Sequence, residues 1–307
     1  MAKILVTPRS LTKECHPALD ALSKAGYDVI FASPGQLPTE NELLRLLPGC
    51  VGYLAGVEKV TAKVLESAHD LKVISRNGTG VDNIDLDAAD RLNIRVCRAI
   101  GANSRGVAEL TIGLILASVR SIPFSDTCIK SGGWERRRGI ELAQRTLGLI
   151  GCGKIGQLVA ESALAFGMDV IAYDTAPDPA FHPSDRFRFA SLGTVFEESD
   201  IISLHCPSCP GGSPLIDAGA LERMKQGVFI VNTARPDLID TSVMIAFLDK
   251  GRVAGLAMDV FEHEPPIDDA LAMHEKVIAT PHIGGFTEES VDGATYAAVA
   301  NLLEYLT

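Results

Sequence analysis

The segment from Leu147 to Asp174 combines three closely spaced glycines with a terminal acid. An apolar strand leads into Gly151-x-Gly153-x-x-Gly156, and a helix and a second strand then reach Asp174. Gly151 permits a tight turn, Gly153 lets the backbone approach a pyrophosphate, and Gly156 lets the helix pack on the strand. The helix N-terminus offers free N–H groups to an anion, and Asp174 can accept a hydrogen bond from a ribose hydroxyl. The pattern predicts a dinucleotide-binding βαβ unit.

The residues after Asp174 favour NAD over NADP. The following sequence, TAPDPA, contains no arginine or lysine, so a ribose 2′-phosphate would meet a carboxylate without a cationic partner. Glycines also mark turns in ordinary βαβ units, but here the strand, turn, helix and second strand stand in the required order. A methyltransferase that used the same turn for S-adenosylmethionine would leave the polar strand ends described next without a role.

Polar side chains come directly after the later predicted strands, which are residues 201–204, 228–231, 255–258 and 277–279. These segments run into His205, into Asn232-Thr233-Ala234-Arg235, into Asp259 and then Glu264, and into Pro281-His282. The carboxyl ends of the strands line the ligand crevice in an open parallel sheet. We therefore expect these side chains to face the cofactor.

The first hundred residues alternate apolar, strand-like segments with helical stretches, a pattern that specifies a parallel, doubly wound sheet. The expected strands are residues 3–7, 27–32, 51–55, 72–75 and 95–98. A long apolar helix is predicted from Ser104 to Arg120, and the polar stretch 121–145 is the expected passage between two domains. The length of 307 residues and the 47% hydrophobic content suffice for two cores.

Charge and composition narrow the class of protein. The formal net charge of -11 argues against binding to nucleic acid or to an acidic membrane surface. The N-terminus lacks the features of a signal peptide, and the longest apolar stretch, 107–119, is interrupted by Glu109 and too short to cross a bilayer. These features predict a cytoplasmic enzyme without a membrane partner.

The seven cysteines do not suggest a disulfide framework, because most lie in or beside apolar strand-like segments. Cys206-Pro207-Ser208-Cys209 has the spacing of a redox or half-metal motif. No second CxxC and no matched histidine pair completes a zinc site. We favour a proline-containing loop at this position and expect no metal.

With these residues in view, the chain resembles the D-2-hydroxyacid dehydrogenase family, and within it the phosphoglycerate dehydrogenase branch. The resemblance covers nearly the whole length. Its motifs are Arg76-Asn77-Gly78-Thr79-Gly80-Val81-Asp82-Asn83-Ile84-Asp85, the glycine turn, His205-Cys206-Pro207, Asn232-Thr233-Ala234-Arg235, Asp259-Val260-Phe261 with Glu264-Pro265, and Pro281-His282-Ile283-Gly284-Gly285.

The resemblance implies an α/β fold of two doubly wound parallel-sheet domains, in which a Rossmann-type cofactor domain is inserted into a flavodoxin-like substrate domain. Residues 1–100 plus 284–307 would form the substrate-binding domain and residues 101–283 the NAD-binding domain. Glu288 and Glu289 suit the start of a C-terminal helix. Its apolar stripe would pack on the N-terminal domain through Val291, Ala294, Ala298, Leu302 and Tyr305. The resemblance also implies a homodimer built around the segment before the glycine turn.

The same resemblance implies reversible, NAD-dependent hydride transfer on a small 2-hydroxy or 2-oxo acid. Arg235 would hold the substrate and stabilise charge on its oxygen, His282 would act as general acid and base, and Glu264 would fix the imidazole tautomer. The implied cofactor-binding residues are Gly151, Gly153, Lys154, Ile155, Gly156, Asp174, His205, Cys206, Pro207, Thr233, Ala234, Asp259, which would face the nicotinamide, and Gly284. The implied substrate-binding residues are Arg76, Asn77, Gly78 and Thr79.

Two departures from the family pattern leave the substrate open. Ala55-Gly56 stands where phosphoglycerate dehydrogenases usually carry an Arg-Ser pair that faces the substrate, so one phosphate cation is missing. Pro236-Asp237 replaces a small pair after Arg235 and adds negative charge there. 3-Phosphoglycerate is thus one candidate among small 2-hydroxy acids, including sugar acids. An alternative is an NAD-sensing, corepressor-like binding protein on the same scaffold.

Overall fold

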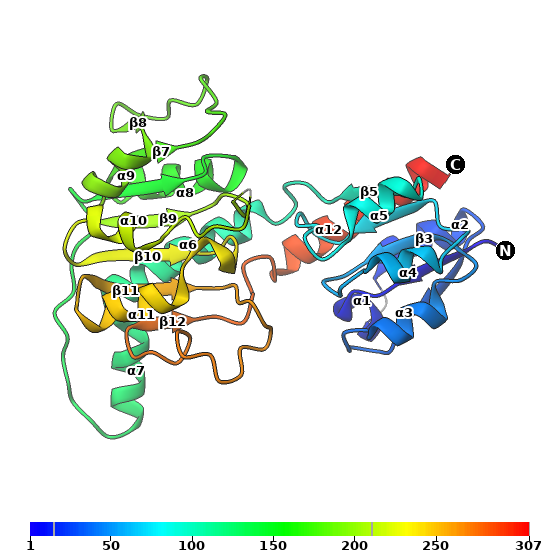
Figure 1. The fold of residues 1–307 in the computed structure, drawn as a ribbon, viewed down its shortest axis with the longest axis horizontal. Helices are drawn as coiled ribbons and strands as arrows, with labels where there is room; N and C mark the ends of the chain where they lie inside the picture. Colours follow the sequence, from blue (N-terminus) through cyan, green and yellow to red (C-terminus); the bar gives the residue numbers. More distant parts are fainter. Residues whose placement is uncertain (15, 210, 307) are drawn as a thin grey trace. The chain divides into compact units, whose positions relative to one another are not determined.

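Two parallel β-sheets, each with helices packed on it, form the computed structural model (Figure 1). The structure describes residues 1–14, 16–209 and 211–306. The chain divides into two compact units, Met1–Asn103 with Gly285–Thr307 and Ser104–Gly284. The fold class predicted from the sequence, two α/β domains with parallel sheets, is confirmed.

The first unit contains a five-stranded sheet in the order β2-β1-β3-β4-β5, which is the flavodoxin-like order. Its strands are β1 (Lys3–Val6), β2 (Asp28–Phe31), β3 (Cys50–Ala55), β4 (Val73–Arg76) and β5 (Arg95–Arg98). All neighbours pair in parallel, and the pairing β3–β4 sets Ala55 opposite Arg76. The chain therefore leaves β1, β3 and β4 at one edge of the sheet.

Short helices connect these strands, and the C-terminal helix returns to the same sheet. The helices are α1 (Arg9–Lys13), α2 (Asp20–Lys24), α3 (Glu40–Leu46), α4 (Ala62–Glu66), α5 (Leu86–Arg91) and α12 (Glu288–Leu306), with a 3-10 turn at Pro17–Leu19. Ala298, Val299 and Leu302 of α12 join the core formed by Ile4 and Leu54. The expected apolar stripe is thus largely correct, but Tyr305 is exposed.

The second unit contains a seven-stranded sheet in the order β12-β11-β10-β9-β6-β7-β8. From β6 outward this is the Rossmann arrangement, in which the strand order reverses between β6 and β9. The strands are β6 (Thr146–Ile150), β7 (Asp169–Tyr173), β8 (Phe187–Phe189), β9 (Ile201–Leu204), β10 (Val228–Asn232), β11 (Val253–Met258) and β12 (Val277–Ala279). The three-residue edge strand β8 was not predicted from the sequence.

Helices cover this sheet and bury its apolar side chains in two clusters. The helices are α6 (Ser104–Val119), α7 (Ile122–Lys130), α8 (Lys154–Ala165), α9 (Leu192–Glu198), α10 (Ala218–Arg223) and α11 (Thr241–Asp249), with a 3-10 turn at Pro236–Leu238. Helices α6 and α8 pack together, and their Leu114 and Val159 share one cluster with Leu149 of β6. This packing fixes the N-terminus of α8 at the end of β6.

The expected interdomain passage at residues 121–145 is wrong. The division between the units falls after Asn103, so that stretch lies inside the second unit. It also contains α7, which begins after Ser121 adopts a left-handed conformation with φ 49°. Helix α7 buries none of its residues, and none of them belongs to the apolar clusters of this unit. No single described helix is long and apolar enough to span a membrane, although α6 and α7, bent by 64°, pass that test as a pair.

Candidate active site

The glycine turn joins β6 to α8 in the geometry that its spacing predicts. Gly151 has φ 95°, and a Cβ there would lie 2.5 Å from the carbonyl oxygen of His205. A Cβ on Gly156 would collide with the carbonyl oxygen of Gly151. At Gly153 a Cβ would meet nothing within 4 Å, and α8 begins at Lys154 with no side-chain cap. The N-terminus of α8 thus has no side-chain cap and has room beside Gly153, which fits a bound pyrophosphate.

Asp174 follows β7 and lies beside the glycine turn. Its Oδ2 accepts a hydrogen bond from the N–H of Cys152 at 2.7 Å, and its Oδ1 accepts one from the N–H of Ala176 at 2.8 Å. Each carboxylate oxygen can accept a further hydrogen bond, because it carries more than one lone pair. These contacts hold the acid where a ribose hydroxyl could donate to it.

The end of β9 lies against the same turn. His205 donates its backbone N–H to the carbonyl oxygen of Ile150 at 2.7 Å, and its Nε2 lies 2.9 Å from the hydroxyl of Ser203. Burial lowers the pKa of His205 to about 4, so the ring is neutral at pH 7 although part of the residue stays accessible. His205 therefore contributes a fixed, uncharged turn rather than an acid or base.

The Cys206–Cys209 loop follows His205 and includes Pro207. Burial, and next the neighbouring Cys209, raise the pKa of Cys206 to about 11. A thiol with so high a pKa is a poor nucleophile and metal ligand at neutral pH. Ser208 donates a hydrogen bond to Asp237 at 2.9 Å, so Asp237 is turned toward this loop. No group of three or more potential metal ligands occurs among the described residues.

Arg235 leaves the end of β10 on a turn that Asn232 organises. Asn232 is fully buried, donates to the carbonyl oxygen of Arg235 at 2.7 Å and accepts from the N–H of Ala234 at 3.0 Å. Thr233 lies 3.0 Å from Thr111 of α6, hydroxyl to hydroxyl. The Arg235 guanidinium donates to the carbonyl oxygen of Ala234 at 2.7 Å. The backbone is thus fixed at the root of the guanidinium.

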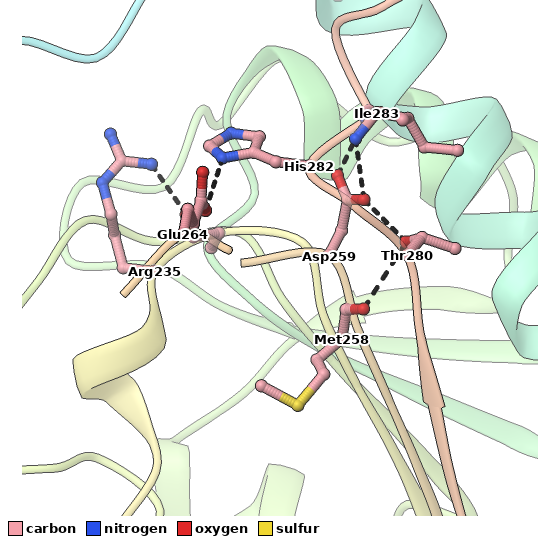
Figure 2. Close-up of polar contacts among 9 residues, drawn as sticks. Arg235, Met258, Asp259, Glu264, Thr280, His282 and Ile283 are labelled. Atoms are coloured by element: carbon pink, nitrogen blue, oxygen red, sulfur yellow. Dashed lines mark hydrogen bonds and ion pairs between the residues drawn. The ribbon is translucent and has the colours of Figure 1, made fainter. Parts of the chain in front are cut away.

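Asp259, directly after β11, holds the loop that follows β12 (Figure 2). Its side chain is buried, and its Oδ1 accepts hydrogen bonds from the hydroxyl of Thr280 at 2.6 Å and the N–H of Ile283 at 2.9 Å. Its Oδ2 accepts the N–H of Gly284 at 2.8 Å. Between these contacts His282 has φ 52°, a left-handed conformation that is strained for a non-glycine residue. The carboxylate of Asp259 therefore stabilises a backbone shape that projects His282.

His282 and Glu264 form a hydrogen-bonded pair next to Arg235 (Figure 2). His282 Nδ1 lies 2.8 Å from Glu264 Oε1, and both side chains remain partly exposed. The hydrogen bond to Glu264 is the largest influence on the pKa of His282 and raises it, and the charges of Glu264 and Asp259 act in the same direction. Partial burial and the charge of Arg235 lower the pKa. The pair leaves Nε2 of His282 available for proton exchange.

The predicted substrate loop belongs to the other unit and follows β4. Asn77 donates its N–H to the carbonyl oxygen of Ala55 at 2.9 Å, and Thr79 donates its hydroxyl to Asn103 at 3.2 Å. Arg76 donates to the carbonyl oxygen of Asn77 at 2.7 Å, and its guanidinium lies against Gly78, which has φ 150°. These contacts form a tight turn with close backbone approach.

The structure brings most of the predicted residues of the second unit to one edge of its sheet. The glycine turn, Asp174, His205, Thr233, Ala234, Arg235, Asp259, Glu264, His282 and Gly284 all follow strand ends there. Two contributors carried no predicted role, Asn232 and Thr280, although Asn232 lies within a quoted motif. Both act through backbone atoms or a neighbouring acid, so only the place of Asn232 at the end of β10 and of Thr280 directly after β12 marks them in the sequence.

This fold and this strand edge define a dinucleotide-binding α/β protein with an acid–base pair. Residues 112–284 match the family model of the NAD-binding domain of D-isomer specific 2-hydroxyacid dehydrogenases. The chain is 42% identical over 257 residues to a hydroxypyruvate reductase of Thermotoga maritima, with 82% of this chain and 83% of that protein aligned. The chain belongs to the D-isomer specific 2-hydroxyacid dehydrogenase family, and the resemblance predicted from its motifs is confirmed.

Two further relatives extend this comparison. A D-3-phosphoglycerate dehydrogenase of Methanocaldococcus jannaschii is 44% identical over 260 residues, which are 83% of this chain but only 50% of that protein. The chain thus spans about half the length of this relative. The crystal structure of D-lactate dehydrogenase from Aquifex aeolicus with NAD and lactic acid has a TM-score of 0.84 and 28% identity, covering 99% of this chain and 95% of that one. The predicted cofactor, NAD, agrees with the family model and with this structure.

Proposed function

We propose that this chain is an NAD-dependent oxidoreductase that interconverts a small 2-hydroxy acid and the corresponding 2-oxo acid. The observation that carries the proposal is the His282–Glu264 pair, 2.8 Å apart and next to Arg235, on the strand edge that bears the glycine turn. A general acid–base pair, a guanidinium and a dinucleotide turn on one edge are what this reaction requires.

In this mechanism the nicotinamide, when bound, supplies or accepts the hydride. Arg235 offers a planar fork of donors that holds the substrate carboxylate or carbonyl oxygen and stabilises negative charge on it. His282 Nε2 donates a proton to the carbonyl oxygen during reduction and takes the hydroxyl proton during oxidation. Glu264 keeps Nδ1 protonated and favours the charged ring, so the imidazole holds the proton that reduction consumes.

The proposed cofactor-binding residues lie at the same edge of the seven-stranded sheet. Lys154, Ile155 and Gly156 begin the helix whose N–H groups would receive the pyrophosphate, together with Gly151 and Gly153. Asp174 would accept from the adenine-side ribose, and the backbone at His205, Cys206, Pro207, Thr233, Ala234 and Gly284 would line the remaining length. Asp259 would lie beside the nicotinamide while its carboxylate holds the His282 loop.

The loop after β4 in the first unit is the proposed substrate-binding element of that unit. Backbone N–H groups of Asn77, Gly78 and Thr79 would bind the substrate carboxylate, and Arg76 would add a positive charge nearby. The relatives named hydroxypyruvate reductase, D-3-phosphoglycerate dehydrogenase and D-lactate dehydrogenase support a small 2-hydroxy or 2-oxo acid as the substrate class. A 3-carbon acid, with or without phosphate, fits this range.

We further propose a homodimer that uses α7 and the segment after it. Helix α7 buries none of its residues, and Ile122, Ile129 and Trp134 are 52%, 55% and 85% exposed. Large apolar side chains exposed in one continuous segment mark an interaction surface. Analytical ultracentrifugation should give twice the 32.7 kDa chain mass, and Trp134→Glu should shift the protein toward the monomer. The cytoplasmic location stays a prediction.

Turnover measurements test the proposed activity. NADH oxidation, followed by absorbance with a panel of 2-oxo acids, should reveal at least one substrate. His282→Ala should lower kcat by about 10²- to 10⁴-fold, because it removes the proton donor, and should leave the Kd for NADH nearly unchanged. Binding of NADH without turnover of any 2-oxo acid would instead favour a cofactor-sensing protein, and equal activity of the variant would remove His282 as acid and base.

A further inference from the structure

A buried carboxylate, that of Glu58, lies at the carboxyl edge of the five-stranded sheet and belongs to neither the proposed catalytic nor the proposed cofactor-binding residues. Glu58 follows β3 and is only 1% exposed. Its Oε1 accepts hydrogen bonds from the hydroxyl of Thr7, from the hydroxyl of Tyr53 at 2.5 Å and from the N–H of Gly56 at 2.9 Å. Its Oε2 is buried and has no hydrogen-bond partner among the described residues. A carboxylate kept in this state is costly, so it requires a reason.

A positive charge reaches this cluster from Arg76, which lowers the pKa of the neighbouring Tyr53. Among the described residues Glu58 has no ion-pair partner, and the ion pairs of this unit at Glu40, Glu66 and Asp292 involve other acids. Tyr53 is fully buried, and burial followed by the charge of Glu58 raises its pKa well above the usual range, so Tyr53 remains a neutral donor. Neutral donors stabilise the negative charge of Glu58 without cancelling it.

The turn that carries Glu58 is joined to the substrate loop. Asn83 donates one hydrogen bond to the carbonyl oxygen of Glu58 at 2.7 Å and another to that of Gly56 at 3.3 Å. Val60 donates its N–H to the carbonyl oxygen of Asn83 at 2.7 Å, and Asn77 donates to Ala55 at 2.9 Å. The Gly56–Glu58 turn therefore lies directly beside the loop that begins at Asn77.

The buried position of the Glu58 carboxylate requires glycine at position 56. A Cβ on residue 56 would lie 2.6 Å from Oε2 of Glu58 and 3.2 Å from the Cα of Pro8. The carboxylate thus occupies the volume that a side chain at position 56 would need. This chain consequently presents a negative charge, and no side chain of Ala55 or Gly56 that could bind an anion, on this side of the loop.

We propose that Glu58 is a specificity-determining residue that selects an unphosphorylated 2-hydroxy or 2-oxo acid. The inference rests on the proposed function, in which the loop from Asn77 binds the substrate carboxylate. A phosphate adds nearly two negative charges to that substrate. In a protein-like dielectric, repulsion between one buried carboxylate and a nearby phosphate weakens binding of such a group by about tenfold or more.

Steady-state kinetics with hydroxypyruvate and 3-phosphohydroxypyruvate test the proposal. The natural chain should show a kcat/KM at least about tenfold higher for the unphosphorylated acid. Glu58→Gln removes the charge at nearly constant shape and should reduce this ratio about tenfold, mainly through a lower KM for the phosphorylated acid. The KM for NADH should stay unchanged. Glu66→Gln, on the exposed face of α4, is the matched control and should leave the ratio unchanged.

A second variant separates charge from packing. Tyr53→Phe removes one donor to Glu58 and keeps the charge, so its substrate ratio should stay within about twofold of the natural chain. A change in Tyr53→Phe as large as that in Glu58→Gln would overturn the proposal, as would a folded Glu58→Gln protein with an unchanged ratio. A natural chain that prefers the phosphorylated acid would overturn it without any variant.

The role of Glu58 can be tested independently of turnover. If neither acid is turned over, the dehydrogenase proposal depends on the remaining 2-oxo acids of the panel, and calorimetry with D-glycerate and 3-phosphoglycerate in the presence of NAD still decides about Glu58. Tighter binding of D-glycerate would support the proposal, and tighter or equal binding of 3-phosphoglycerate would overturn it.

Discussion

Replacing Asp259 by asparagine isolates the contribution of one buried carboxylate to the position of His282. Both oxygens of Asp259 accept hydrogen bonds from the loop after β12, at 2.6 Å from Thr280, 2.9 Å from Ile283 and 2.8 Å from Gly284. An asparagine has the same shape but only one acceptor oxygen, and its NH₂ group must face at least one backbone N–H. The variant therefore loses one charge-assisted hydrogen bond and converts the others into neutral ones.

The size of the effect follows from these contacts. A hydrogen bond to a charged group contributes about 1.5–3 kcal/mol, so the loop loses about 2–4 kcal/mol of stabilisation. The left-handed conformation of His282 costs about 1–2 kcal/mol, which the carboxylate offsets in the natural chain. Since the loss exceeds this cost, the loop should relax and carry His282 away from its working position. Each 1.4 kcal/mol corresponds to a factor of ten in population, so a loss of about 2–4 kcal/mol should lower kcat about 30- to 700-fold.

Stopped-flow and steady-state measurements of NADH oxidation, combined with NADH fluorescence titration, test this reasoning. We expect a reduced kcat with a Kd for NADH within a few-fold of the natural chain. Asp185→Asn, which changes a fully exposed acid of the same unit, is the control. An unchanged kcat with a much weaker Kd for NADH would show that Asp259 acts on the nicotinamide alone, and the role of loop support would be refuted.

Three further perturbations test neighbouring residues. The hydrogen bond to Glu264 raises the pKa of His282, so kcat/KM for reduction should fall as the pH rises through that pKa. Glu264→Gln should move this fall to lower pH. An unmoved pH profile would show that Glu264 does not set the pKa of His282. Asp174→Ser should narrow the NADH over NADPH preference by about tenfold, measured as the ratio of kcat/KM, because it removes the acceptor for the ribose hydroxyl and the repulsion of a 2′-phosphate. The pKa of His205 is lowered to about 4, so the unfolded state binds its proton first and stability should decrease as pH falls from about 6.5 to about 4. Because part of His205 is accessible, we expect a loss of about 1–2 kcal/mol, which urea unfolding should detect and His205→Asn should abolish.

The dinucleotide turn was predictable because its determinants are local. The apolar strand expected before Gly151 is present as β6 (Thr146–Ile150), since a short apolar run that ends in glycine has few other uses in a parallel sheet. The steric demand on Gly156 is likewise local, because the colliding atoms belong to Gly151, whereas a Cβ on Gly151 would meet His205 and Cys206 after β9. Helix α7 was missed because it lies within the polar stretch 121–145, and β8 because three residues are too few to show an alternating strand pattern.

The contacts that position the catalytic side chains could not be predicted from residue types. Asp259 was assigned to the nicotinamide, but the structure shows its carboxylate bound to two backbone N–H groups and a hydroxyl of another loop. Those N–H groups point to Asp259 only because His282 adopts a positive φ, which no sequence pattern signals for a histidine. Glu58 escaped notice for a similar reason, since its donors Thr7 and Tyr53 are distant or apolar-strand residues.

Two acids thus support His282 in different ways, and this division has a mechanistic consequence. Glu264 acts on the imidazole through Nδ1 and is the main cause of the raised pKa, whereas Asp259 adds a smaller charge effect on that pKa and acts mainly on the backbone that places the ring. A single acid that did both would link the protonation of His282 to its position, and each proton transfer would then disturb the geometry needed for the next. Because the backbone contacts are buried and the ring remains about half exposed, His282 can exchange its proton with solvent between turnovers while its loop stays fixed. Glu264→Gln and Asp259→Asn should therefore differ in kind, the first changing the pH profile and the second the maximal rate.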